Sequence, residues 1–187
     1  RDFAGKDQGL GLLDDNCWTN DYELSFALHL EAAECLYLCG DFDQAERGIE
    51  LVLSRAADKL DKAKVYRLRM VQRENTSRYA EALACAREAW ELFGVTFPDL
   101  AEEKQAALEQ ELDSIQLLLN GRSIESLIEL PVMADPEIRM VLNIMTTIWS
   151  STYILGDAIL ARLISATMVR LSLMHGNAEE SAYGYVT

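Results

Sequence analysis

The apolar and polar positions along this chain follow the period of α-helices, with apolar residues recurring at intervals of three and four. Alternation typical of strands is nearly absent, and proline occurs only three times in 187 residues. The fold is therefore predicted to be all-α. The clearest apolar stripe, with steps of four, three and four, consists of Leu108, Leu112, Ile115 and Leu119.

Residues that start and stop helices divide the chain. A cap residue followed three positions later by Glu or Gln occurs at Asn20, Asp41 and Asp99, and this pattern is typical of helix N-termini. The connections look short, so neighbouring helices are expected to lie antiparallel. Helices are predicted over about 21–39, 41–57, 59–74, 78–94 and 99–121. A short helix is predicted over 123–130, and two more are predicted from Pro136 onward and over 157–175.

One helix junction has a second copy. The stretch "GDFDQAERGIELVLSRA" aligns with "SRYAEALACAREAWELF" at an offset of 37 residues, which is close to the 34-residue period of tetratricopeptide repeats. We therefore predict antiparallel helix pairs stacked as a degenerate tetratricopeptide-like superhelix. The alternative is an ordinary helical bundle whose turns look alike. The aligned positions are Gly40 with Ser77, Phe42 with Tyr79, Ala45 with Ala82, and Val52 with Ala89.

Each position of this repeat has a predicted structural role. Gly40 makes the turn, Asp41 caps the second helix, and the aromatic ring of Phe42 fills the space between paired helices. Ala45 lets the first helix approach closely, and Ala33 is the matching small residue on that helix. In the second copy, the equivalent positions are Tyr79, Ala82 and Ala89. This copy is less regular, because it has Arg69 and Arg73 where small or apolar residues are typical.

A fainter third copy, "YILGDAILARLISATMV", keeps Gly156 and Asp157. It has Ile159 instead of an aromatic residue, and Arg162 near the small position. We interpret residues 1–187 as one helical-repeat domain and expect it to be a fragment of a longer protein. Its predicted parts are a lead-in (1–18), the two clearest helix pairs (19–94), and irregular pairs with the start of a further helix (95–187).

Charge and cysteine content narrow the function classes. The chain carries 17 Lys and Arg against 31 Asp and Glu, a net charge of -14, which repels nucleic acid and anionic membranes. Four dispersed cysteines and the lack of a signal-peptide pattern favour a reducing cytoplasm. The apolar run over 140–155 is broken by polar residues and too short for a membrane span, so we interpret it as a core helix.

No motif for catalysis is present, and we predict no catalytic, cofactor-binding or metal-binding residue. Cys35 and Cys39 share a helix face at a spacing that could hold a metal, but no second ligand pair accompanies them, so buried thiols are the favoured reading. His29 and His175 lie in no ligand motif. Core packing is likewise favoured over a binding groove for the aromatic residues Trp18, Tyr22, Tyr37, Tyr66, Tyr79, Trp90 and Trp149.

Several phrases carry a family resemblance across nearly the whole chain. They include "W-x-x-x-Y-E-L" at 18–24, "G-R-S-I" at 121–124, "L-P-x-M-x-D-P" at 130–136 and "LSLMHGNAEESAYGYV" at 171–186. The sequence resembles the helical, tetratricopeptide-like region of large signalling kinases. In that family a Ser/Thr-kinase-like domain and an AAA-type ATPase precede this region, and a GAF domain and a histidine kinase follow it.

The resemblance implies bacterial two-component signalling in the cytoplasm and no catalytic residue in this region. Our first hypothesis is therefore a non-catalytic interaction and relay module that binds a protein partner or neighbouring domains of its own chain. The alternative is a small-molecule sensor in which the Thr- and Ser-bearing segment 139–155 lines an inducer pocket. An exposed concave groove favours the first hypothesis, and an enclosed polar cavity beside Thr146 and Ser150 favours the second.

Overall fold

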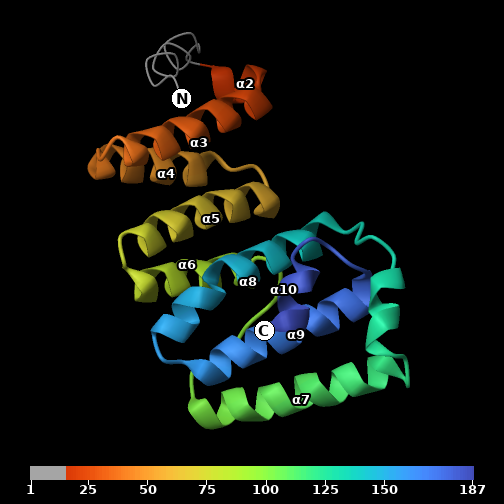
Figure 1. The fold of residues 1–187 in the computed structure, drawn as a ribbon. Coiled ribbons are helices and arrows are strands. Elements are labelled where there is room, and N and C mark those ends of the chain that lie inside the picture. Colours follow the sequence, from red (N-terminus) through yellow and green to blue (C-terminus); the bar gives the residue numbers. More distant parts are fainter. Residues whose placement is uncertain (1–15) are drawn as a thin grey trace.

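The computed structural model describes residues 16–187, which form a stack of helices (Figure 1). The prediction of an all-α fold is confirmed. Within this part of the chain, the only strand-like pairing is an isolated parallel bridge between Val132 and Asn177. The helices are α2 (Cys17–Asn20), α3 (Tyr22–Leu38), α4 (Phe42–Arg55), α5 (Lys59–Asn75), α6 (Tyr79–Glu91), α7 (Ala101–Leu119), the 3₁₀ helix η1 (Ile124–Glu129), α8 (Pro136–Ile154), α9 (Ala158–His175) and α10 (Ser181–Val186).

Three pairs of helices share one kind of turn. The pairs α3/α4, α5/α6 and α8/α9 each pack together, and their turns place Gly40, Ser77 and Gly156 at φ of 85°, 58° and 79°. In each turn the next amide donates to a carbonyl five residues back, which is the Schellman pattern of helix ends. These hydrogen bonds run from Asp41 N to Leu36 O (3.0 Å), from Arg78 N to Arg73 O (2.8 Å) and from Asp157 N to Thr152 O (3.0 Å).

Ser77 occupies the left-handed position that glycine fills in the other two turns. Replacing Ser77 with glycine should raise the free energy of unfolding by about 0.5 to 1 kcal/mol, because relief of the left-handed strain exceeds the extra entropy of an unfolded glycine. Urea denaturation of Ser77→Gly measures this gain. The matched change Gly156→Ser should have the opposite sign, and a loss of stability in Ser77→Gly would contradict the account.

The caps follow local sequence in some helices only. The Asp41 carboxylate accepts from Gln44 N at 3.2 Å, as predicted. The predicted caps at Asn20 and Asp99 are wrong: the N-cap of α3 is Asp21, without a side-chain cap bond, and that of α7 is Leu100. Both helices start one residue later than those caps require, so the sequence pattern alone misplaced their first turns.

The first helices of the first two pairs lie parallel. Near their N-termini the Tyr22 hydroxyl donates to Asp61 at 2.7 Å, and near their C-termini the Tyr37 hydroxyl donates to Gln72 O at 3.4 Å. Burial, then the bond to Asp61, raises the pKa of Tyr22 to about 12. The two contacts join like ends, so α3 and α5 run in the same direction.

The helices α5 and α8 are also parallel and are connected at both ends. Lys59 and Glu137 form an ion pair at 2.6 Å between the two N-terminal turns. Glu74, near the C-terminus of α5, accepts a hydrogen bond from Ser151, and burial raises the pKa of this carboxyl. Because α3 contacts α5 and α5 contacts α8, the three first helices form a continuous row.

The two unexpected arginines of the second pair form ion pairs with the first pair. Arg69 lies 2.7 Å from Glu50 and also pairs with Glu46, while Arg73 reaches Glu46 at 2.7 Å. The Arg69 and Arg73 side chains are only 13% and 17% exposed. Cations at these positions of α5 therefore connect it to α4, where a typical repeat packs small or apolar side chains.

Helix α7 breaks the expected order of neighbours. It packs on α9, with which it lies parallel, and it occupies the end of the stack beyond α9 (Figure 1). Lys104 pairs with Asp157, and Glu111 pairs with Arg170. The expectation of uniformly short connections and antiparallel neighbours is wrong here, because the longer segments 92–100 and 120–135 carry the chain to α7 and back to α8.

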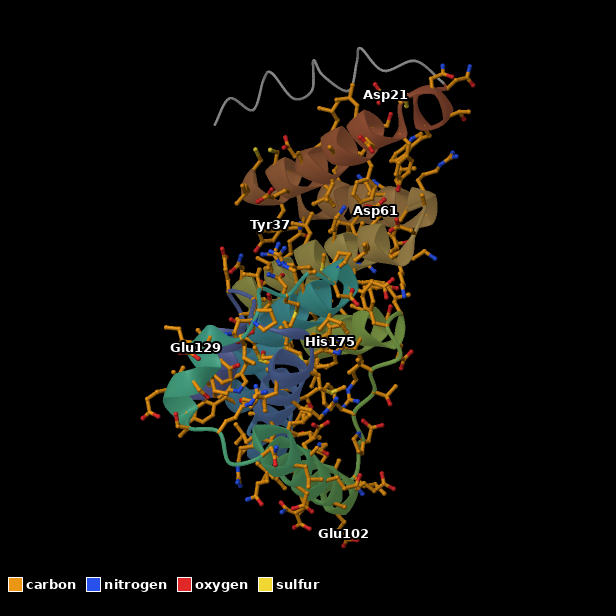
Figure 2. The ribbon with its side chains drawn as sticks, turned by 90° about the vertical axis from the view of Figure 1, so that its right-hand side faces the viewer. Asp21, Tyr37, Asp61, Glu102, Glu129 and His175 are labelled. Carbon is orange, nitrogen blue, oxygen red and sulfur yellow. The ribbon has the colours of Figure 1, made fainter. Side chains whose placement is uncertain are left out.

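Two apolar cores follow from this arrangement. The smaller one lies among α3, α4 and α5 and includes Phe26, Ile49 and Val65. The larger one extends from α5 and α6 through α8 and α9. The predicted stripe on α7 contributes Leu108 to it, whereas Leu112 is 43% exposed. Figure 2 shows the elongated result, with Asp21 and Glu102 toward opposite ends.

One described helix, α9, is long and apolar enough to cross a membrane by length and composition. More than half of it, 56%, is buried within the fold, and the central helix of a water-soluble domain meets the same criteria. The segment 140–155 lies in α8 and its C-cap. Its side chains include buried core residues such as Leu142 and Ile148 and exposed ones such as Tyr153. The prediction of no membrane span stays a prediction.

Candidate functional site

The small residues predicted to allow close helix packing are buried. Ala33 and Ala45 are each 1% exposed, and Ala82 and Ala89 are fully inaccessible. A close approach of α3 and α4 involves Gly48, which the sequence analysis missed. A β-carbon at Gly48 would lie 3.1 Å from that of Ala33. The sequence did indicate this position, because Gly48 follows Ala45 by three residues and so lies on the same face of α4.

One detail of the predicted repeat is wrong. Phe42 does not fill the space between helices: its side chain is 54% exposed, and its ring lies against Tyr37 at 5.4 Å. In the third pair, Ala161 follows Gly156 by five residues, as Ala45 follows Gly40, and it is buried at 3%. Arg162, which the sequence analysis put near this position, is the next residue and is exposed. Tyr79, which starts α6, is half-buried.

The thiol and imidazole groups form no metal centre among residues 16–187, where no cluster of three or more His, Cys, Asp or Glu side chains occurs. Cys35 is buried but Cys39 is exposed, so the interpretation of both as buried thiols is wrong for Cys39. His29 stacks on Trp18 at 4.9 Å, and burial lowers its pKa.

The aromatic residues serve packing in most places. Trp90 is 1% exposed and meets Phe97 edge-on at 4.9 Å. The Trp149 indole donates to Ser165 Oγ at 2.9 Å. None of the aromatic residues weighed for a binding groove lines the open groove that α3, α5 and α8 border.

That groove lies along the row of first helices and is open to solvent. It has a volume of about 640 Å³ and is bordered by α3, α5, the start of α8 and the segment before α10. A second open groove of about 620 Å³ adjoins it and shares Arg67, Asn143 and Glu180. Half-buried apolar side chains lie in the first groove, namely Leu30, Leu68, Val71 and Met140.

The charges of the groove are unevenly distributed. Glu31 and Glu34 line the α3 side. Exposed cations come from the other two helices: Lys64 and Arg67 from α5, and Arg139 from α8. We call Lys64, Arg67 and Arg139 the basic cluster.

Two members of the basic cluster have no anionic partner within the described chain. Lys64 Nζ lies 2.8 Å from Asp61. Arg67 and Arg139 form no ion pair with any residue of 16–187. The nearby carboxylate of Glu180 already accepts from Asn143 Nδ2 at 2.8 Å. The two guanidinium groups are therefore available to an anionic group from outside.

The residues proposed for an inducer pocket are separated. Thr146 lines the second groove, and its hydroxyl donates to Leu142 O of its own helix at 3.0 Å. Ser150 lines neither groove and lies beside Glu74. Within the described residues, Thr146 and Ser150 thus do not share an enclosed cavity.

Two of the phrases that carry the family resemblance meet in space. Asn177 N donates to Pro131 O at 2.7 Å, and Met133 N donates to Asn177 O at 2.8 Å. The Asn177 side chain donates to Leu127 O at 2.7 Å and accepts from the Tyr185 hydroxyl at 2.8 Å. We call this junction the Asn177 clamp. It fixes the segment leading into α8, which borders the groove.

Comparison with protein-family models, curated proteins and solved structures gave no match. The signalling-kinase resemblance consequently stays a prediction from the sequence phrases alone.

Proposed function

We propose that this chain is a non-catalytic interaction module whose groove along α3, α5 and α8 binds a protein segment or a neighbouring domain. The observation that carries this proposal is the open groove on a row of parallel first helices. Stacked helix pairs of the tetratricopeptide type present their first helices on a concave surface and use it for binding. We further propose that the pairs form such a degenerate superhelix, within a cytoplasmic sensor kinase as the resemblance implies.

The geometry of the groove supports a peptide more than a small molecule. Ligand sites for small molecules bury most of the ligand in a concave pocket. Here both grooves are open and extend over several helices, so an extended chain could contact α5 and α8 together. The alternative of inducer sensing would require a ligand near Thr146, which borders the second groove.

Selection from a random displayed-peptide library against the purified chain tests the proposal. We expect selected peptides to protect α3, α5 and α8 in hydrogen exchange, and Val71→Asp to weaken their binding about tenfold or more by placing a charge in the apolar part of the groove. Val71 belongs to neither core, so the variant should fold.

The matched control is Leu117→Asp on α7, where the native side chain is 80% exposed and outside both grooves. Binding should be unchanged in this variant. Protection on α7 or η1 instead, or no selected peptide at all, would refute the proposed function. A small metabolite that protects the surroundings of Thr146 would support the sensor alternative.

A further inference from the structure

We propose that the groove selects peptides whose acidic side chains pair with Arg67 and Arg139 while apolar side chains pack on Leu68 and Met140. The inference rests on the proposed function and specifies its ligand. It starts from a contrast within the molecule. The chain carries net charge -14, yet the groove exposes Arg67 and Arg139 without an anionic partner among residues 16–187.

Other cations of comparable position do have partners. Arg69 and Arg73 lie on α5, as Arg67 does, and both pair with Glu46 of α4. On α9, Arg170 pairs with Glu111 of α7. Arg67 and Arg139 form no ion pair with residues 16–187, as is also true of exposed cations such as Arg162. They differ from those cations in that both line the groove and come from different helices.

An arginine side chain binds carboxylates with two parallel hydrogen bonds and does so best where water is partly excluded. The groove offers that environment, because half-buried Leu68, Val71 and Met140 lie beside the cations. A ligand with an acidic residue next to an apolar one would satisfy both features. Lys64, although held by Asp61, adds positive potential on the same side.

The acidic side chains of the groove set the polarity of the ligand. Glu31 and Glu34 lie on α3, opposite the basic cluster, and Glu179 and Glu180 lie beyond Asn143. Glu179 and Glu180 would repel a uniformly acidic peptide at their edge of the groove. The acidic residues of the ligand should therefore be confined to the part that crosses α5 and the start of α8.

The test uses the full 187-residue chain and an unbiased displayed-peptide library. We expect selected peptides to be enriched in Asp and Glu beside an apolar residue. For a synthetic copy of one selected peptide, changing its acidic residue to the matching amide should weaken binding about tenfold, as for one charge-assisted hydrogen bond. Arg67→Gln and Arg139→Gln should each give a similar loss.

Controls separate charge pairing from damage to the fold. Arg162→Gln removes an exposed cation of α9 outside both grooves and should leave affinity unchanged. Arg67→Glu should restore binding of a peptide whose acidic residue is replaced by Lys. Thermal melting of every variant should match the native chain, since both arginines are exposed.

The outcomes distinguish this inference from the proposed function. Peptides that protect the groove but show no acidic preference, with affinity unchanged in Arg67→Gln and Arg139→Gln, would overturn the charge preference alone. Peptides that bind elsewhere, or the absence of any selected peptide, would overturn both.

Discussion

Replacing Gly176 with alanine should lower the free energy of unfolding by about 3 to 5 kcal/mol, the range for strain combined with overpacking. A β-carbon at this position would lie 2.2 Å from Pro131 O and 3.3 Å from Met133 N. The first distance is far inside van der Waals contact, and the atom belongs to backbone that the Asn177 clamp holds in place. The φ of 96° adds strain for any residue with a side chain.

A matched control isolates the close contact from backbone strain. Gly94 also has a left-handed φ of 72°, but a β-carbon there would meet no atom within 4 Å. Gly94→Ala should therefore cost only about 1 kcal/mol. Urea denaturation of the two variants gives the comparison. Equal losses of stability would contradict a special role of the Gly176 contact.

Replacing Ala45 with glutamate should destabilise the chain by about 3 to 5 kcal/mol, because the carboxylate would be buried without a partner where α3 and α4 meet. Ala45 is 1% exposed. The introduced carboxylate could reach water only if α3 and α4 moved apart. Thermal melting of Ala45→Glu should show unfolding at a clearly lower temperature than the native chain.

The control is Leu51→Glu on the same helix, where the native side chain is 40% exposed. It adds the same charge at a solvated position, so stability should change by about 0.5 kcal/mol or less. An unchanged melting temperature in Ala45→Glu would show that Ala45 is not at the tight interface of the pair.

The sequence predicted those parts of the fold that depend on neighbouring residues. The turn at Gly40 and the cap at Asp41 follow from a glycine and a carboxylate acting within one helix turn. The burial of Ala33 and Ala45 follows from helical period and residue size. Each of these predictions depends only on residues that lie close together in the chain.

The sequence could not predict features that depend on distant partners. Lys104 reads as a surface residue of an acidic helix, yet it is 8% exposed and pairs with Asp157. Nothing near it in the sequence indicates that α7 packs beyond α9. The groove was equally hidden, because Arg67 and Arg139 become neighbours only when α5 and α8 align.

The placement of α7 has a consequence for how the chain reaches its native state. The paired helices meet partners that follow directly in the chain, so their contacts form with little loss of chain entropy. Contacts of α7 with α9 join residues 53 and 59 positions apart. Closing such loops is slow and entropically costly, and it cannot precede the folding of α9. Docking of α7 is therefore the step most sensitive to the length of the segment 120–135, which lies inside the loops that these contacts close. An insertion there should slow folding more than an insertion of the same size in the tight turn of a helix pair.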